Sequence, residues 1–126
     1  MTYKIVIPGE LPDTNTIITE SKRGRGKWQP YNEIKQEYTN MVAWIAKSEI
    51  KKQLKKIDLT ITWICPNRRK DKDNISGGIK FILDGLVVAG VIKDDGWAQV
   101  GDIYHKFKVD KYNPRVEVEI REVEEI

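Results

Sequence analysis

The chain has 126 residues, of which 40% are hydrophobic and 33% charged, and we expect residues 1–126 to form one globular domain. No apolar run approaches the roughly 20 residues that cross a bilayer, and the first residues lack a signal peptide's apolar core, so we expect a cytoplasmic protein without a membrane partner. The single cysteine, Cys65, excludes an intramolecular disulfide and a cysteine-based zinc site. The net charge is only +3, but residues 21–72 hold fourteen Lys and Arg against five Asp and Glu, which is typical of a face that binds a polyanion.

The N-terminal half predicts a strand, a loop and a long helix. Residues 3–7 (YKIVI) predict a short strand that ends at Pro8 and Gly9. Residues 11–27 are expected to form a loop, and its basic cluster at residues 22–27 is expected to be mobile unless an anion orders it. The cations of this cluster are candidate DNA ligands: Lys22, Arg23, Arg25 and Lys27. Apolar residues from Ile34 to Leu54 recur at helical spacing and predict a helix over about 30–54.

The remainder predicts a strand, a second helix and a hairpin. Residues 57–65 alternate between apolar and polar side chains, as in a strand with one buried face. Apolar spacing from Ile75 predicts a helix to about Ala89, with an irregular first turn at Gly77–Gly78. Residues 105–120 predict a hairpin in which Glu117 and Glu119 neutralise Lys108 and Lys106. We therefore expect an α+β fold, with two main helices packed on a small mixed sheet.

Acidic and basic residues alternate after the central strand, in the segment RRKDKDN (residues 68–74). If the chain is still extended there, Asp71 and Asp73 point the same way, because side-chain direction repeats every two residues. Two such carboxylates repel each other unless a proton or a cation lies between them, and Mg²⁺ binds a few carboxylates while it keeps several waters. Asp95 or Asp94, from a distant loop, would complete a cup of three carboxylates. The cations that could bind a phosphate beside it are Arg68, Arg69, Lys70, Lys72 and Lys80.

The same residues also allow a structural interpretation. Asp73 or Asn74 could cap a helix, and Asp94–Asp95–Gly96 is typical of a turn. Lys80 and Asp84, four residues apart, could form a surface ion pair. From the residues alone, the catalytic and structural interpretations are equal alternatives.

Further positions at fixed spacing follow in IKFILDGLVVAGVIKDDGWAQV (residues 79–100). Together with RRKDKDN, this string resembles the signature of RusA-type Holliday-junction resolvases, endodeoxyribonucleases of bacteria and their phages. The family pattern is a basic lead-in, Asp-x-Asp-Asn, a helix with Lys and then Asp-x-Leu four residues on, a Gly and an Asp-Asp pair. The matching positions are Asp71, Asp73, Asn74, Lys80, Asp84, Leu86, Gly90, Asp94 and Asp95.

This resemblance implies a metal-dependent nuclease that cuts branched DNA, above all four-way junctions, with Mg²⁺ or in its place Mn²⁺ as cofactor. It assigns the metal to Asp71, Asp73 and Asp95, with Asp94 as a further candidate, and an assisting role to Lys80. More residues separate Asn74 from Lys80 than in other members, but the excess is close to one helical turn. Resolution needs two symmetric cuts and one chain offers one acidic cluster, so we expect a homodimer.

Two other classes of function stay open. One is a non-catalytic protein that binds junctions or duplex DNA through its basic face, although all three acids of the nuclease pattern are present. The other is a calcium-binding or partner-interaction domain, which leaves the Arg and Lys surplus unexplained. An EF-hand is a poorer interpretation, because Ser76 and Ile82 stand where its loop needs Gly and Glu.

Overall fold

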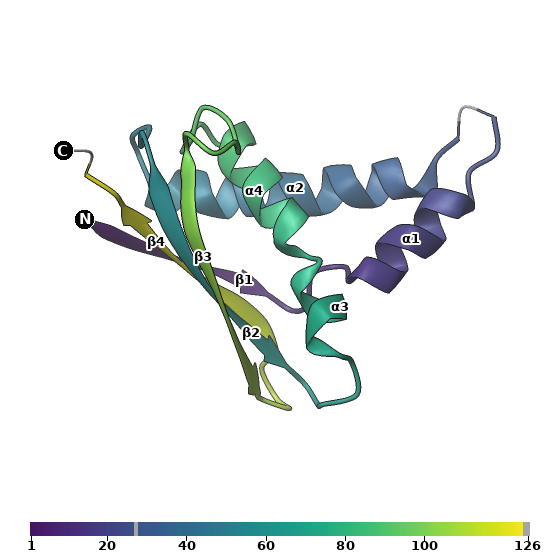
Figure 1. The fold of residues 1–126 in the computed structure, drawn as a ribbon. Helices are drawn as coiled ribbons and strands as arrows, with labels where there is room; N and C mark the ends of the chain where they lie inside the picture. The colour runs from purple at the N-terminus through teal and green to yellow at the C-terminus, as the bar shows by residue number, and fades with distance from the viewer. Residues whose placement is uncertain (27, 125–126) are drawn as a thin grey trace.

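A computed structural model describes residues 1–26 and 28–124 as a four-stranded mixed sheet with helices on it (Figure 1). The elements are β1 (Thr2–Pro8), α1 (Thr14–Lys22), α2 (Pro30–Glu49), β2 (Ile57–Cys65), α3 (Lys72–Ser76), α4 (Ile79–Val88), β3 (Val100–Val109) and β4 (Arg115–Glu122). The strand order is β1–β4–β2–β3, with β2 and β3 parallel and the other neighbours antiparallel. The expected α+β class is confirmed, with α2 and α4 as the main helices. Within these residues, no helix has the length and apolarity that a bilayer crossing requires.

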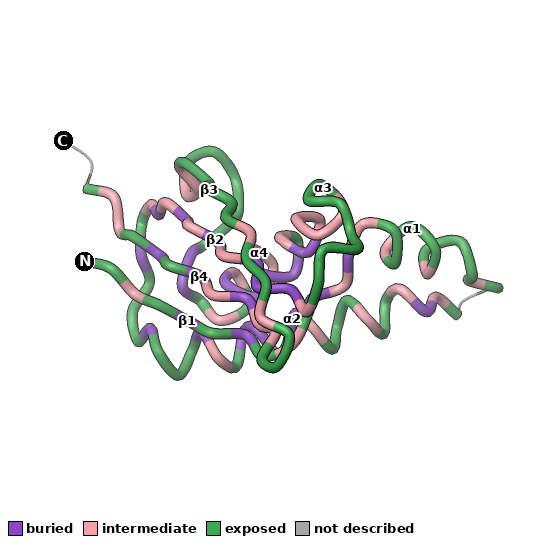
Figure 2. The backbone as a smooth tube through the Cα atoms, turned by 90° about the horizontal axis from the view of Figure 1, so that it is seen from below, coloured by how far each residue is buried: buried purple, intermediate pink, exposed green. Residues whose placement is uncertain are grey.

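The core lies between one face of the sheet and the two main helices (Figures 1 and 2). The central strand β2 carries it, because Leu59, Ile61 and Trp63 alternate with less buried polar residues on the other face. Gly85 lets α4 approach α2 closely, since a Cβ there would lie 2.5 Å from Cγ1 of Val42. This packing holds α4 against α2, and α3, which precedes α4, lies near the end of β2 (Figure 1).

The predicted irregularity at Gly77–Gly78 is a break between α3 and α4. A Cβ on Gly78 would lie 3.0 Å from Cβ of Leu11, and one on Gly77 would collide with Oγ1 of Thr14. Both glycines therefore allow the segment that precedes α1 to pack against the break. Asp71 and Asp73 lie at the start of α3, the short helix before this break.

The prediction of a loop over residues 11–27 is wrong for residues 14–22, which form α1. Asp13 caps this helix, because its Oδ1 accepts a hydrogen bond of 2.7 Å from the backbone N–H of Thr16. Ile17 packs against the core cluster. Of the basic loop, Lys27 lies outside the described residues.

The expected hairpin of residues 105–120 is also wrong, because β2 lies between β3 and β4. Val109 pairs with Cys65 of β2, and Val116 pairs with Trp63 of the same strand. Lys108 is consequently opposite Ile64 and not opposite Glu117. This register places Lys108 at the end of the sheet where the acidic segment leaves β2.

Candidate metal and DNA site

Asp71 and Asp73 line one open hollow of about 670 Å³ at the end of β2 and β3. The other lining residues are Cys65, Asn67, Arg68, Lys70, Lys72, Ile75, Phe107, Lys108 and Val109. Asp71 is still extended, with ψ 151°, whereas Asp73 already belongs to the first turn of α3. The two carboxylates thus share a hollow as predicted, but through a strand-to-helix turn and not through a continuous extended chain.

The carboxylate of Asp71 makes no capping hydrogen bond to α3, although Asp71 occupies the N-cap position. Asp73 accepts one local hydrogen bond, of 3.0 Å, from the backbone N–H of Asn74. Both residues are exposed. Helix capping therefore does not account for Asp71, and its oxygens are available for a ligand.

An aromatic row along β2 and β3 borders this hollow. Nε1–H of Trp63 donates a 3.0 Å hydrogen bond to Nδ1 of His105, whose ring stacks on that of Phe107. Burial lowers the pKa of His105, which favours the neutral imidazole that accepts this bond. Nζ of Lys72 lies 5.5 Å from the centre of the Phe107 ring, a cation–π distance. The row thus holds one of the cations beside the acidic pair.

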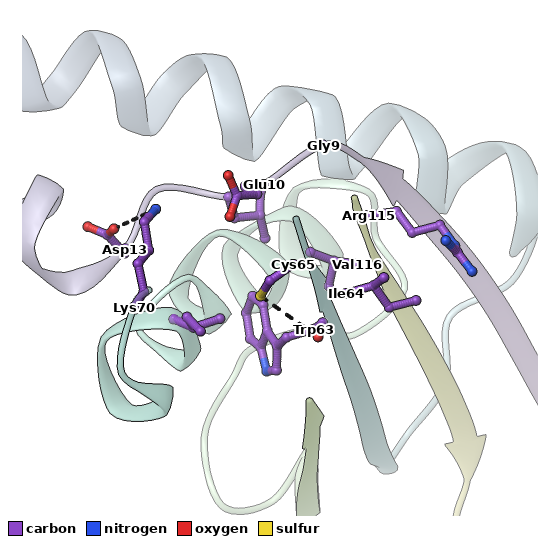
Figure 3. Close-up of a pocket in the computed structure, with 11 residues that line it drawn as sticks. Gly9, Glu10, Asp13, Trp63, Ile64, Cys65, Lys70, Arg115 and Val116 are labelled. Carbon is purple, nitrogen blue, oxygen red and sulfur yellow. Dashed lines mark hydrogen bonds and ion pairs between the residues drawn. The ribbon is translucent and has the colours of Figure 1, made fainter. Parts of the chain in front are cut away.

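Asp13 forms an ion pair with Lys70, the residue directly before Asp71 (Figure 3). Nζ of Lys70 lies 2.9 Å from Oδ2 of Asp13, whose side chain is 8% exposed. Burial raises the pKa of Asp13, but hydrogen bonds from Lys70 and Thr16 outweigh it and hold the pKa below its usual value. A second bond, 2.9 Å from the backbone N–H of Asn15 to Oδ1 of Asn74, ties α1 to α3.

Asp94 and Asp95 lie at the opposite end of β3, in the turn that precedes the strand. Asp95 lines a separate shallow hollow with Trp97 and Ile103. The ladder from Val100 to Val109 spans about 30 Å at roughly 3.3 Å per residue. In residues 1–26 and 28–124, no three His, Cys, Asp or Glu side chains lie close enough to hold a metal ion. One chain therefore brings Asp71 and Asp73 together but does not bring Asp95 to them.

In a comparison with protein families, the model of the endodeoxyribonuclease RusA matches residues 11–121. The chain belongs to the RusA family. This family consists of endodeoxyribonucleases of the Holliday-junction resolvase type, which act on branched DNA junctions. A comparison with curated proteins finds no match.

The helical part of the RusA pattern lies on α4. Lys80 is exposed there and is not among the residues that line the acidic hollow. Its Nζ lies 3.8 Å from Oδ2 of Asp84, so the two form the predicted i,i+4 pair. That oxygen accepts no hydrogen bond from the described residues. The contact is long and leaves Lys80 able to turn toward another anion.

The remaining predicted DNA ligands lie in two places. Arg69 is exposed in the loop that also carries Arg68 and Lys70. Lys22, Arg23 and Arg25 lie at the end of α1 and just beyond it, away from the acidic hollow (Figure 1). Nη1 of Arg23 lies 2.8 Å from Oε1 of Glu20, so its charge is partly balanced.

The sequence analysis missed Phe107 and Lys108, which line the acidic hollow, and Asp13, which pairs with Lys70 of that hollow. Asp13 precedes a Thr-Asn-Thr segment, and this helix-capping signal was available from the sequence. Phe107 and Lys108 depend on which strand lies beside β2, and local sequence does not contain that information.

Proposed function

We propose that this RusA-family chain is an Mg²⁺-dependent endodeoxyribonuclease that resolves four-way DNA junctions by paired, symmetric cuts during recombination and repair in the cytoplasm. One observation carries the proposal: Asp71 and Asp73 share an open hollow with Arg68 and Lys72. Phosphodiester hydrolysis needs a metal held by acids, with cations beside it that bind the phosphate. A hollow that contains both kinds of group, in a family of nucleases, suits this reaction.

The donor set fits a hard divalent cation. Mg²⁺ prefers oxygen ligands, and it commonly binds one or two carboxylates while water and substrate phosphates complete its shell. Asp71 and Asp73 would hold the ion, and when bound, Mg²⁺ or Mn²⁺ supplies activation of the attacking water and compensates charge on the phosphate. Arg68 and Lys72 would hold the phosphate by charge, and Lys80 would assist by leaving its long contact with Asp84.

A homodimer would bring the third carboxylate to this pair. Asp95 lies about 30 Å along β3 from the hollow, so a second copy is needed if Asp95 is to bind the same ion. The edge strand β3 offers a surface for it, because β3 has ten residues and no further strand pairs with its outer edge within residues 1–26 and 28–124. Ile103, Tyr104 and Val109 also expose between 37% and 56% of their surface along this strand.

Antiparallel pairing of two β3 edges across a two-fold axis has a definite consequence. The start of each strand, which follows the turn of Asp94 and Asp95, would lie beside the end of the other strand, where Asp71 and Asp73 lie. Two equivalent sites would result, one for each cut.

The first experiment measures cleavage and binding separately. Purified protein is incubated with a labelled four-way junction and with linear duplex, with and without Mg²⁺. We expect Asp73→Asn to retain junction binding and to lose cleavage. Glu37→Gln is the matched control, because Glu37 is an exposed acid on α2, outside the hollow and away from the β3 edge, and it should cleave like the wild type. Loss of the circular dichroism spectrum in Asp73→Asn would instead support the capping interpretation.

The same experiment decides between the two other classes of function. Junction binding without cleavage at any Mg²⁺ concentration would support a non-catalytic DNA-binding protein. Neither binding nor cleavage would support a calcium-binding or partner-interaction domain, although Ca²⁺ takes six to eight oxygen ligands and no group of three acids forms in the described chain.

A further inference from the structure

We propose that the lysines at the end of α2 form a second contact surface for the phosphate backbone of a DNA arm, separate from the acidic hollow; this rests on the proposed function. Lys47 and Lys51, with Lys52, line a hollow of about 230 Å³ that the Ala89–Gly90 turn closes on the other side. Lys55 and Lys56 follow in sequence. These five lysines fall within ten residues, at the opposite end of α2 from the basic loop after α1.

Two of the three lysines that line this hollow have no carboxylate partner in the described residues. Lys52 lies 3.5 Å from Oε2 of Glu122, but neither Lys47 nor Lys51 forms an ion pair with a carboxylate of residues 1–26 or 28–124. The negative end of the α2 dipole accounts for Lys47, which lies in the last turn. It does not account for Lys51, because the helix ends at Glu49. Lys47 and Lys51 are thus two exposed cations at one hollow without a carboxylate partner in the described residues, and such cations attract a polyanion.

The chain links this surface to the turn that carries Asp95. The backbone N–H of Leu54 donates a 2.7 Å hydrogen bond to the carbonyl oxygen of Val91, three residues before Asp94. A phosphate backbone held by Lys47 and Lys51 would therefore lie along the same end of the molecule as Asp95. The 20 residues of α2 span about 30 Å, so this surface and the basic loop could hold different arms of one junction.

The test is the salt dependence of binding, measured without Mg²⁺ by fluorescence anisotropy of a labelled four-way junction. Each phosphate contact contributes about 0.9 to the slope of log K against log salt, so K47Q/K51Q should lower the slope by about 1.8 for each protomer whose surface contacts the junction. Between 50 and 200 mM salt, the wild type should thus lose about 12-fold more affinity than the double variant for each such protomer.

The matched control is K4Q/K106Q, which removes two positive charges from the outer face of the sheet. These lysines lie beside Glu117 and Glu119, which repel phosphate, so the control should keep the wild-type slope. Equal slopes for the two double variants, in protein that binds and cuts junctions, would overturn the proposal and leave the nuclease function intact. If the wild type does not bind DNA, the function and this proposal fail together.

Discussion

Two inactive variants should recover cleavage when they are mixed, because the proposed site takes its acids from two copies of the chain. Asp71→Asn removes a carboxylate from the hollow, and Asp95→Asn removes one from the turn at the other end of β3. Every site in either homodimer is then incomplete. In the heterodimer, one site carries both substitutions and the other carries neither. Random exchange makes about half of the dimers heterodimers, and one of the two sites in each heterodimer is intact. About one quarter of all sites are then intact, so nicking should reach about one quarter of the wild-type rate.

The assay follows single-strand nicking of a junction labelled on opposing strands, after equimolar subunits have exchanged. The product should be a nicked junction and not a pair of symmetric cuts, because each heterodimer has one intact site. A mixture of Asp71→Asn with Asp73→Asn is the matched control: both acids lie in the same hollow, so every site stays incomplete and no activity should return. The mixture of Asp71→Asn with Asp95→Asn could recover no nicking activity while wild-type protein stays active after the same exchange. That result would refute a site shared between two chains.

Two further predictions concern stability. Asp13→Ala should lower the free energy of unfolding by about 1–2 kcal/mol in urea titrations, because it removes the α1 cap and leaves Lys70 unpaired, whereas Asp13→Asn should cost less. The pKa of Asp13 in the folded protein lies below its usual value, so the contribution of Asp13 to the free energy of unfolding is complete above about pH 4 and disappears as the pH falls further. Parallel curves of the free energy of unfolding against pH for wild type and Asp13→Asn would contradict this. Gly85→Ala should cost about 1–3 kcal/mol through the clash with Val42, whereas Gly96→Ala, whose nearest contact is 3.6 Å away, should be nearly neutral.

Local sequence was sufficient where neighbouring residues decide the conformation. The alternation of residues 57–65 predicted β2 because side chains of a strand reach opposite faces. The glycine pair predicted an irregular first turn of one helix, and the structure has a break between α3 and α4 at this place. For α1, local sequence held only the capping signal of Asp13, and the prediction of a loop was wrong because the apolar contacts of Ile17 come from elements distant in the chain.

By itself, the sequence determined the order of acids and cations along the chain, and therefore which charged groups are available for chemistry. It identified Asp71 and Asp73 as a pair, which two residues of spacing already bring close. Only the tertiary structure decided that β2 separates β3 from β4, which moves Lys108 beside that pair and Asp95 to the far end of β3. Strand order depends on which faces can be buried together, and such contacts between distant residues leave no local periodicity for the sequence to reveal.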